Sequence, residues 1–303
     1  MKKLLITHTD LDGISPILLL KLTGEKFDYK NAEPSELDEV FEELKPELDK
    51  YEQIIFTDLT VSMNVYDYIN ENNLNVVVLD HHITHDYANQ FKYATVKVEL
   101  NGRKTCATEL FYEYLKDKYD VMKSEKIKEY VEYVRQLDTY TFESDEPKKL
   151  ENIRTVYGRE EFIKVMKRRL LSKKEHFEFN AFEKKFIKLK QQEIENYLVK
   201  KDELMKKYEI NGKVIGIVFC DKYKSELGNY LCNQHPDVEF VAMIDPCKAV
   251  SYRGVGDADC GSFAEIYGGG GHKLASGSPF DDDMRDRIVK EYFEGAKLII
   301  DEE

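Results

Sequence analysis

The chain has 303 residues, of which 42% are hydrophobic and 34% charged, and its formal net charge is −13. This length predicts two domains, and the composition is typical of a soluble globular protein. The excess of acidic side chains argues against binding to long duplex nucleic acid, which depends on neutralising many phosphates. The apolar run before His8 is too short for a signal peptide or a spanning helix, and five scattered cysteines without a CxxC pair are typical of reduced thiols. We therefore expect a cytoplasmic protein without a membrane partner.

The first 80 residues alternate short apolar runs with segments of helical periodicity. Strands are predicted over 3–7, 53–56 and 75–79, and helices over 13–22, 36–48 and 61–69. Short buried strands that alternate with helices are typical of a mainly parallel sheet with helices on both faces. From Thr105 to about Phe179 the pattern becomes mostly helical.

A long charged segment from Phe182 to about Tyr208 carries apolar residues on a rough stripe, which predicts a linker helix. After it we expect strands over 214–219, 238–244 and 249–252, helices over 227–232 and 284–296, and a glycine-rich turn at 268–271. The sequence thus predicts an α/β protein of two lobes joined by a helical linker. The predicted boundaries are a domain over 1–180, a linker helix over 181–207 and a smaller α/β domain over 208–303.

Acidic and imidazole side chains follow each of the first three predicted strands. His8, Asp10 and Asp12 follow the first strand, Asp58 the second, and Asp80-His81-His82 the third. Parallel sheets bind ligands at the carboxyl ends of their strands, so these side chains should meet at one edge. Two like charges about 4 Å apart repel by roughly 4 kcal/mol at an effective dielectric of 20, so several carboxylates there require divalent cations. Carboxylates with imidazoles suit Mn²⁺ best, with Mg²⁺ or Co²⁺ as alternatives.

Each of these residues also has an ordinary structural explanation. Asp12 or Asp58 could cap a helix, and a lone His8 is more often a polar surface residue than a ligand. Asp138 lies within a helical pattern, where an aspartate is usually solvated. Their joint occurrence beside the adjacent histidines 81 and 82 favours the metal site.

Four segments resemble the motifs of the DHH phosphoesterase superfamily in order and spacing. His8-Thr9-Asp10-Leu11-Asp12-Gly13 resembles the first motif, Asp58 the second, Asp80-His81-His82 the motif that names the family, and Leu137-Asp138-Thr139 the fourth. The resemblance implies one metal bound by His8, Asp10 and Asp58, and a second bound by Asp12, Asp58, His81 and Asp138, with Asp58 bridging. It also implies that Asp80 orients ligands through hydrogen bonds, while His82 faces the substrate and stabilises the phosphoryl oxygens or the leaving group.

A glycine-rich segment near the end of the chain, Gly268 to Gly277, resembles a motif of the DHH-associated domain of nucleases and oligonucleotide phosphodiesterases. Consecutive glycines can adopt positive φ and point backbone N–H groups at an anion. Tyr140 and Tyr252 are the tyrosines that we expect to stack on bases. The predicted substrate-binding residues are Ser251, Arg253, Gly269, Gly270, Gly271 and His272.

The resemblance implies two-metal hydrolysis of a phosphate ester. Our first interpretation is a Mn²⁺-dependent phosphodiesterase that hydrolyses short oligonucleotides (nanoRNA) to mononucleotides, with 3′-phosphoadenosine-5′-phosphate as an additional candidate substrate. The alternatives are a hydrolase of linear or cyclic dinucleotides such as pApA and cyclic di-AMP, a single-strand-specific exonuclease, and a nucleotide-binding regulator without activity. The acidic balance favours short RNA or DNA over long duplexes, and a homodimer is compatible with the sequence.

Overall fold

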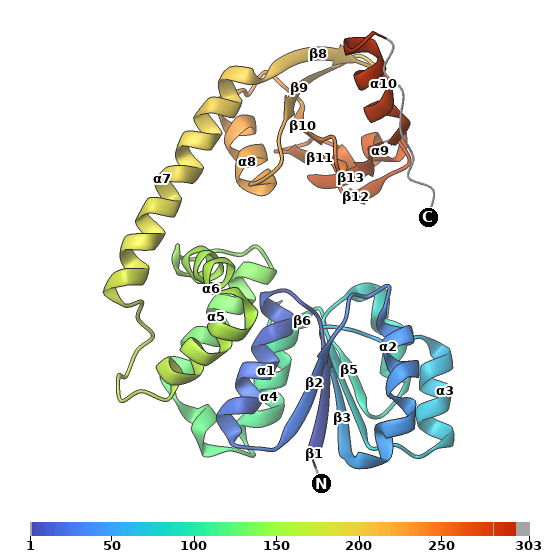
Figure 1. The fold of residues 1–303 in the computed structure, drawn as a ribbon, viewed down its shortest axis with the longest axis vertical. Coiled ribbons are helices and arrows are strands. Elements are labelled where there is room, and N and C mark those ends of the chain that lie inside the picture. Colours follow the sequence, from blue (N-terminus) through green and yellow to red (C-terminus); the bar gives the residue numbers. More distant parts are fainter. Residues whose placement is uncertain (1, 281, 295–303) are drawn as a thin grey trace. The chain divides into compact units, whose positions relative to one another are not determined.

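The computed structural model describes residues 2–280 and 282–294, and it divides into two compact units, Met1–Ile187 and Lys188–Glu303. The first unit contains a parallel sheet with helices, and the second contains a smaller sheet with helices (Figure 1). The predicted α/β fold with a mainly parallel sheet in its N-terminal part is therefore confirmed.

The sheet of the first unit has five parallel strands in the order β2-β1-β3-β4-β5. The strands are β1 (Lys2–Thr7), β2 (Phe27–Asn31), β3 (Tyr51–Thr57), β4 (Val76–Asp80) and β5 (Ala94–Val96). Successive side chains of a strand point to opposite faces. Leu5 accordingly packs into one core, and Leu4 and Ile6 pack into the other. Burial on both faces explains why β1, β3 and β4 read as continuous apolar runs.

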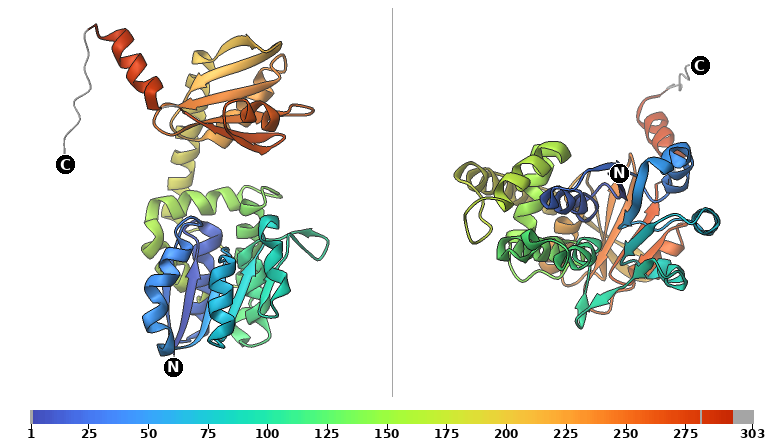
Figure 2. Two further views of the ribbon diagram at one scale, coloured as in Figure 1. Left: turned by 90° about the vertical axis from the view of Figure 1, so that its right-hand side faces the viewer. Right: turned by 90° about the horizontal axis from the view of Figure 1, so that it is seen from below.

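Helices cover both faces of this sheet, as Figures 1 and 2 show. One core lies under α1 (Leu11–Thr23), α4 (Ala107–Lys116), α5 (Glu125–Asp138) and α6 (Glu146–Leu170). The other lies under α2 (Leu37–Leu44) and α3 (Met63–Glu71). The remaining elements are the hairpin of β6 (Glu99–Leu100) and β7 (Arg103–Lys104), and the 3₁₀ segments η1 (Lys45–Lys50), η2 (Ile83–Gln90) and η3 (Asp120–Lys123).

Three features of the first unit differ from the prediction. The helix expected over 36–48 ends at Leu44, because Pro46 has no N–H to continue the helical ladder, and a 3₁₀ turn follows. Strand β2 was not predicted, since this edge strand is only partly buried and carries no apolar run. The three-residue edge strand β5 was also missed.

Helix α7 (Ala181–Leu204) begins in the first unit and continues into the second. The second sheet has the order β12-β13-β11-β10-β9-β8, and only β9 and β10 run parallel. Its strands are β8 (Lys206–Ile210), β9 (Lys213–Phe219), β10 (Phe240–Asp245), β11 (Ala249–Gly254), β12 (Gly270–His272) and β13 (Ala275–Pro279). Helix α8 (Lys224–Gln234) packs with one side of this sheet and α9 (Cys260–Glu265) with the other.

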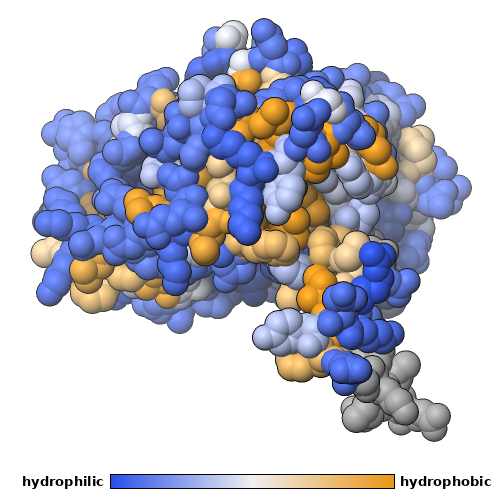
Figure 3. Space-filling model, turned by 90° about the horizontal axis from the view of Figure 1, so that it is seen from above, coloured by the Kyte–Doolittle hydropathy of each residue, from blue (hydrophilic) through white to orange (hydrophobic). Residues whose placement is uncertain are grey.

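The C-terminal helix α10 covers Asp282–Tyr292, and residues 295 and 296 of the helix predicted there lie outside the described residues. The face of the molecule in Figure 3 is mostly hydrophilic, in keeping with a chain in which 34% of the residues are charged. Among the helices of the described residues, none combines the length and the apolar character needed to cross a membrane.

Candidate metal centre

The predicted site residues of the first unit follow three neighbouring strands, except Asp138, which is the last residue of α5. Register pairs Thr7 of β1 with Thr57 of β3, and Thr57 with Leu79 of β4, so these strands end side by side. The chain places β2 on one side of β1 and β3 on the other, which makes the β1–β3 junction the switch point of the sheet. Open α/β sheets bind their ligands at such a point.

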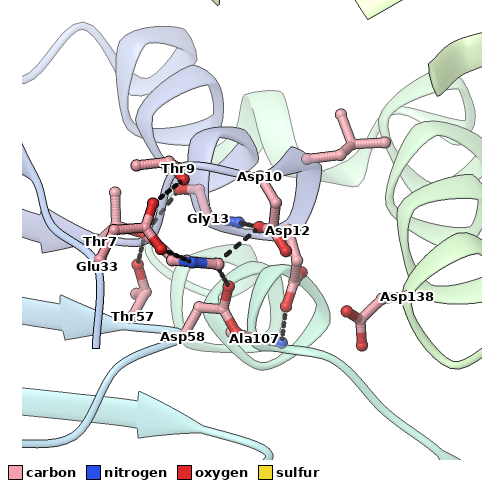
Figure 4. A network of polar contacts seen from close by, with 12 residues as sticks. Thr7, Thr9, Asp10, Asp12, Gly13, Glu33, Thr57, Asp58, Ala107 and Asp138 are labelled. Atoms are coloured by element: carbon pink, nitrogen blue, oxygen red, sulfur yellow. Dashed lines mark hydrogen bonds and ion pairs between the residues drawn. The ribbon is translucent and has the colours of Figure 1, made fainter. Parts of the chain in front are cut away.

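The loop after β1 is folded tightly against the strand ends (Figure 4). Thr7 Oγ1 donates to the carbonyl oxygen of Gly13 at 2.6 Å, and Thr57 Oγ1 donates to Thr7 Oγ1 at 2.8 Å. A Cβ atom at position 13 would lie 2.3 Å from the carbonyl oxygen of His8. Only glycine fits there, and the close approach holds His8 beside the start of α1.

The first ligand group consists of His8, Asp10 and Asp58. His8 Nδ1 lies 3.3 Å from Asp10 Oδ1 and 3.6 Å from Asp58 Oδ2. The other ring nitrogen of His8 lies 3.2 Å from Glu33 Oε2, and Glu33 Oε1 accepts from Thr9 Oγ1 at 2.7 Å. Glu33 therefore fixes the ring so that Nδ1 faces the two carboxylates. Glu33 was not predicted as a site residue, because it follows the unpredicted strand β2.

The second ligand group consists of Asp12, His81 and Asp138, with Asp58 again beside it. His81 Nε2 lies 3.2 Å from Asp58 Oδ1, 3.6 Å from Asp138 Oδ2 and 3.7 Å from Asp12 Oδ2. Asp58 thus turns one oxygen toward each group. Its backbone has φ 59, a left-handed conformation that aspartate tolerates better than most residues.

The buried carboxylate of Asp12 is held by a helix from elsewhere in the chain. Its two oxygens accept the backbone N–H groups of Ala107 at 2.7 Å and Thr108 at 2.8 Å, the first residues of α4. Helix N-termini stabilise anions through free N–H groups and the helix dipole. Helix capping was one explanation for Asp12 at the sequence level. The structure shows that Asp12 meets a helix N-terminus and lies in a ligand group as well, and that Asp10 caps α1 through the Gly13 N–H at 2.9 Å.

The mutual proximity of these groups perturbs their protonation. Hydrogen bonds with Asp10 and Asp58 raise the pKa of His8 to about 11. Burial lowers the pKa of His81, but Asp58, Asp12 and Asp138 outweigh it and raise that pKa to about 10. Burial, followed by the charges of Asp58 and Asp138, raises the pKa of Asp12 well above its usual range. The chain therefore concentrates more negative charge here than it can neutralise by itself.

Asp80 is fully buried and accepts hydrogen bonds at both oxygens. Oδ1 accepts from the backbone N–H of His81 at 2.7 Å and from His82 Nδ1 at 2.8 Å. Oδ2 accepts from Thr60 Oγ1 at 2.8 Å and from His85 Nδ1. Burial alone would raise the pKa of Asp80, but the hydrogen bonds from His82 and His85 hold it below its usual range.

The predicted substrate-binding residues of the second unit share one region of its sheet. Cross-strand pairing aligns Arg253 with Ala275 and His272, and aligns Ser251 with Gly277 and Gly270. Residues directly opposite each other point to the same face, so Arg253 and His272 flank a strip of small residues. Arg253 donates to Ser225 Oγ at 3.2 Å, and Gly228 leaves the space that its side chain fills.

The glycine run does not form the expected open turn throughout. The N–H groups of Gly268 and Gly269 donate to the carbonyl oxygens of Glu265 at 3.1 Å and Ala264 at 2.9 Å, which ends helix α9. Gly268 has φ 74, the conformation of a helix C-terminal glycine. The Gly269 N–H is therefore engaged within the protein instead of pointing at an anion, while Gly270, Gly271 and His272 belong to strand β12.

The two tyrosines expected to stack on bases lie in different surroundings. Tyr252 is buried with Phe240 and Phe263, and its hydroxyl contacts Ser278 Oγ at 2.8 Å, so its predicted role is wrong. Tyr140 follows Asp138 by two residues and is 54% exposed.

The ligand atoms of the first unit fit divalent metals. One atom from each of His8, Asp10 and Asp58 lies within 4.8 Å of the others, and the same holds for Asp12, His81 and Asp138. Carboxylate oxygens with one imidazole per group are a donor set for cations such as Mn²⁺ and Mg²⁺. The repulsion among the carboxylates gives a physical reason for cations here.

Comparison with known proteins is consistent with this geometry. Residues 2–135 match the family described as DHH family, N-terminal domain. Oligoribonuclease NrnB of Bacillus subtilis (strain 168) is 32% identical to the chain over 302 residues, which are 95% of this chain and 75% of that protein. This chain belongs to the DHH family.

A solved structure shares the fold of this DHH protein along nearly its whole length. The pGpG-specific phosphodiesterase PggH of Vibrio cholerae matches with a TM-score of 0.57 and 15% identity, covering 96% of this chain and 97% of that chain. The prediction of a DHH phosphoesterase, a hydrolase that acts on phosphate esters, is confirmed at the level of the family.

Proposed function

We propose that this DHH protein is a two-metal phosphodiesterase that hydrolyses short oligonucleotides to mononucleotides, with Mn²⁺ as its ion. The observation that carries the proposal is the position of Asp58 between two ligand groups. Its Oδ2 lies 3.6 Å from His8 Nδ1 and its Oδ1 lies 3.2 Å from His81 Nε2. A carboxylate shared in this way is what a pair of closely spaced ions requires. The relative named oligoribonuclease supports the substrate class.

Each ligand group has its own support from the chain. We assign His8, Asp10 and Asp58 to one ion, and Asp12, Asp58, His81 and Asp138 to the other. Bound ions would supply a nucleophilic water at neutral pH and positive charge beside the phosphoryl oxygens. Glu33 holds His8, and the α4 N-terminus holds Asp12, so both groups are oriented before an ion arrives.

His82 is the residue that we expect to contact the substrate. Because its Nδ1 donates to Asp80, its Nε2 edge faces away from that carboxylate, and its side chain is 48% exposed. An imidazole held in this way can donate a proton or a hydrogen bond to a phosphoryl oxygen or to the leaving group. Asp80 acts on His82 by fixing its orientation.

The smaller domain predicted over 208–303, which lies in the second unit, is the substrate-binding domain in this proposal. Arg253 offers positive charge and N–H donors to a second phosphate, and His272 on the same sheet face offers a further donor. A small number of local contacts of this kind is sufficient to bind a short anion. A net charge of −13 disfavours a long duplex, which would require a continuous basic surface.

The test is hydrolysis with Mn²⁺ of a matched panel that contains RNA of two to five nucleotides, a longer single strand, pApA, cyclic di-AMP and 3′-phosphoadenosine-5′-phosphate. We expect the short RNAs to be hydrolysed fastest, and His82→Ala to abolish their turnover. His176→Ala is the control, because His176 is an exposed histidine that contacts Glu129, outside the ligand groups. Hydrolysis of pApA or cyclic di-AMP without hydrolysis of the RNAs of three to five nucleotides, or preference for the bisphosphate, would overturn the proposed substrate class. Binding of Mn²⁺ without hydrolysis of any member would refute the activity.

A further inference from the structure

The carboxylate of Asp80 has a second imidazole partner that the DHH motif does not include. His85 lies in the 3₁₀ segment η2, which begins directly after His82, and its Nδ1 contacts Asp80 Oδ2. The rings of His82 and His85 are 5.5 Å apart and inclined by 58°, so they do not stack on each other. The connection between these two histidines therefore runs through Asp80.

The two oxygens of Asp80 serve two different sets of donors. Oδ1 accepts from His82 Nδ1 at 2.8 Å and from two backbone N–H groups, whereas Oδ2 accepts from Thr60 Oγ1 at 2.8 Å and from His85. The side chain is completely buried, so its two oxygens depend on these donors from the protein. Rotation of the carboxylate would break contacts at both oxygens at once, and a buried charged oxygen left without a donor is costly. Donors on Oδ2 thus fix the plane in which Oδ1 meets His82.

We propose that His85 is a positioning residue, which locks the Asp80 carboxylate from its Oδ2 side and thereby fixes the ring of His82 for catalysis. The inference rests on the proposed function, because it assigns His85 to the residue that acts on the substrate there. His85 is not a member of the ligand groups found among the described residues. It therefore supports turnover without binding a metal or the substrate.

Two substitutions test whether the hydrogen-bond donor of His85 matters, or only the volume of its side chain. In His85→Asn the side-chain amide sits at the position of Nδ1 and can still donate to Asp80, whereas in His85→Gln the amide sits one bond farther out. We expect the Asn variant to keep kcat within about threefold, and His85→Gln and His85→Ala to lose kcat by about 10–100-fold, the usual effect of removing an outer partner of a catalytic histidine. KM should stay nearly constant in all three, because His85 does not contact the substrate.

Thr60→Val removes the other side-chain donor from Asp80 Oδ2, and we expect it to lower kcat, as His85→Gln and His85→Ala do. His176→Gln is the matched control, since His176 Nδ1 also contacts a carboxylate, that of Glu129, at 2.5 Å but on the surface. Mn²⁺ stoichiometry should remain that of the wild type in every variant, and kcat is compared at a temperature at which each variant is fully folded, because loss of a donor to the buried Asp80 carboxylate lowers the melting temperature. The long-range ¹H–¹⁵N spectrum of the His82 ring gives a readout that does not depend on turnover. It should show the Nδ1–H form in the wild type and the Asn variant, and a mixture of forms in the Gln variant.

The outcomes are distinct. Wild-type kcat in both His85→Gln and His85→Ala overturns the inference, and so does an Asn variant as impaired as the Ala variant. A raised KM with unchanged kcat also overturns it, because His85 would then contact the substrate directly. If the wild type hydrolyses no member of the panel, the proposed function fails, whereas the inference about the orientation of His82 is still decided by the ring spectrum.

Discussion

Replacement of Asp58 by asparagine tests whether one carboxylate serves two ions. Asparagine has nearly the same size as aspartate and tolerates the φ of 59 found at this position, so the backbone is not strained by the change. The substitution removes the charge that faces both His8 and His81. We expect it to weaken Mn²⁺ binding at both ligand groups, and not at one alone.

The size of the effect follows from the geometry. A unit charge about 4 Å from another contributes roughly 4 kcal/mol at an effective dielectric of 20, so a carboxylate and a dication contribute roughly 8 kcal/mol before desolvation. If half of this remains as the net effect, about 4 kcal/mol, the affinity of each site falls about a thousandfold. At a Mn²⁺ concentration about 1,000 times the wild-type Kd, each site stabilises the wild type by about 4.1 kcal/mol, and the variant by only about 0.4 kcal/mol.

The assay is thermal unfolding with and without Mn²⁺, together with the number of ions bound at equilibrium. For a unit of this size, about 4 kcal/mol corresponds to an increase in Tm of roughly 8–16 °C per site in the wild type. Asp120→Asn is the control, because Asp120 is exposed and pairs only with Lys123 among the ion pairs of the described residues. A variant that retains one tightly bound Mn²⁺ and half of the wild-type increase in Tm would refute a bridging Asp58.

Three further predictions concern the same centre. Glu33→Gln removes the partner that orients His8, so we expect about 10–100-fold weaker binding of one Mn²⁺ and unchanged binding of the other, measured by calorimetry. The metal-free pKa values of His8, about 11, and His81, about 10, mean that protons occupy both imidazoles at neutral pH and compete with metal. Mn²⁺ affinity should therefore rise by about tenfold per pH unit and per site between pH 7 and 9, with proton release visible in buffers of different ionisation enthalpy; binding without proton release would contradict this. Gly13→Ala should lower the free energy of unfolding by about 1–3 kcal/mol in chemical denaturation, because its Cβ would collide with backbone, whereas Gly270→Ala meets no neighbouring atom within 4 Å and should be nearly neutral.

The candidate metal centre could be predicted from sequence to the extent that strand ends determine it. Apolar runs identified β1, β3 and β4, and the polar residues that follow such runs in a parallel sheet must meet at one edge. His8, Asp58 and His81 could be placed together on that basis, and the structure brings their ligand atoms within hydrogen-bonding range or slightly beyond it.

The partners of these residues could not be predicted in the same way. Glu33 follows an edge strand that lacks an apolar run, and the N–H groups that hold Asp12 belong to the backbone, which carries no residue signature. One indirect signal exists. Cys106, the residue before α4, makes no side-chain cap, and a helix start without a cap needs an acceptor from elsewhere in the chain.

In the second unit, the sequence did not indicate what its run of glycines does in the fold. Its glycines were interpreted as an anion-binding turn, but one of them ends α9, and another sits where a Cβ would lie 2.0 Å from the carbonyl oxygen of Gly277. A run of glycines indicates unusual backbone or close approach without stating which of the two occurs. Only the tertiary pairing of β12 with β13 decides between a ligand and a neighbouring strand.

The pKa shifts of the candidate metal centre show how its imidazoles and carboxylates affect each other's charge. Four carboxylates within one site would repel each other strongly, but the raised pKa values of His8 and His81 favour an imidazolium in each ligand group, and burial raises the pKa of Asp12 as well. Positive charge on the two imidazoles thus offsets part of the repulsion among the carboxylates. We therefore expect a divalent ion that binds to these residues to displace the protons that the carboxylates favour.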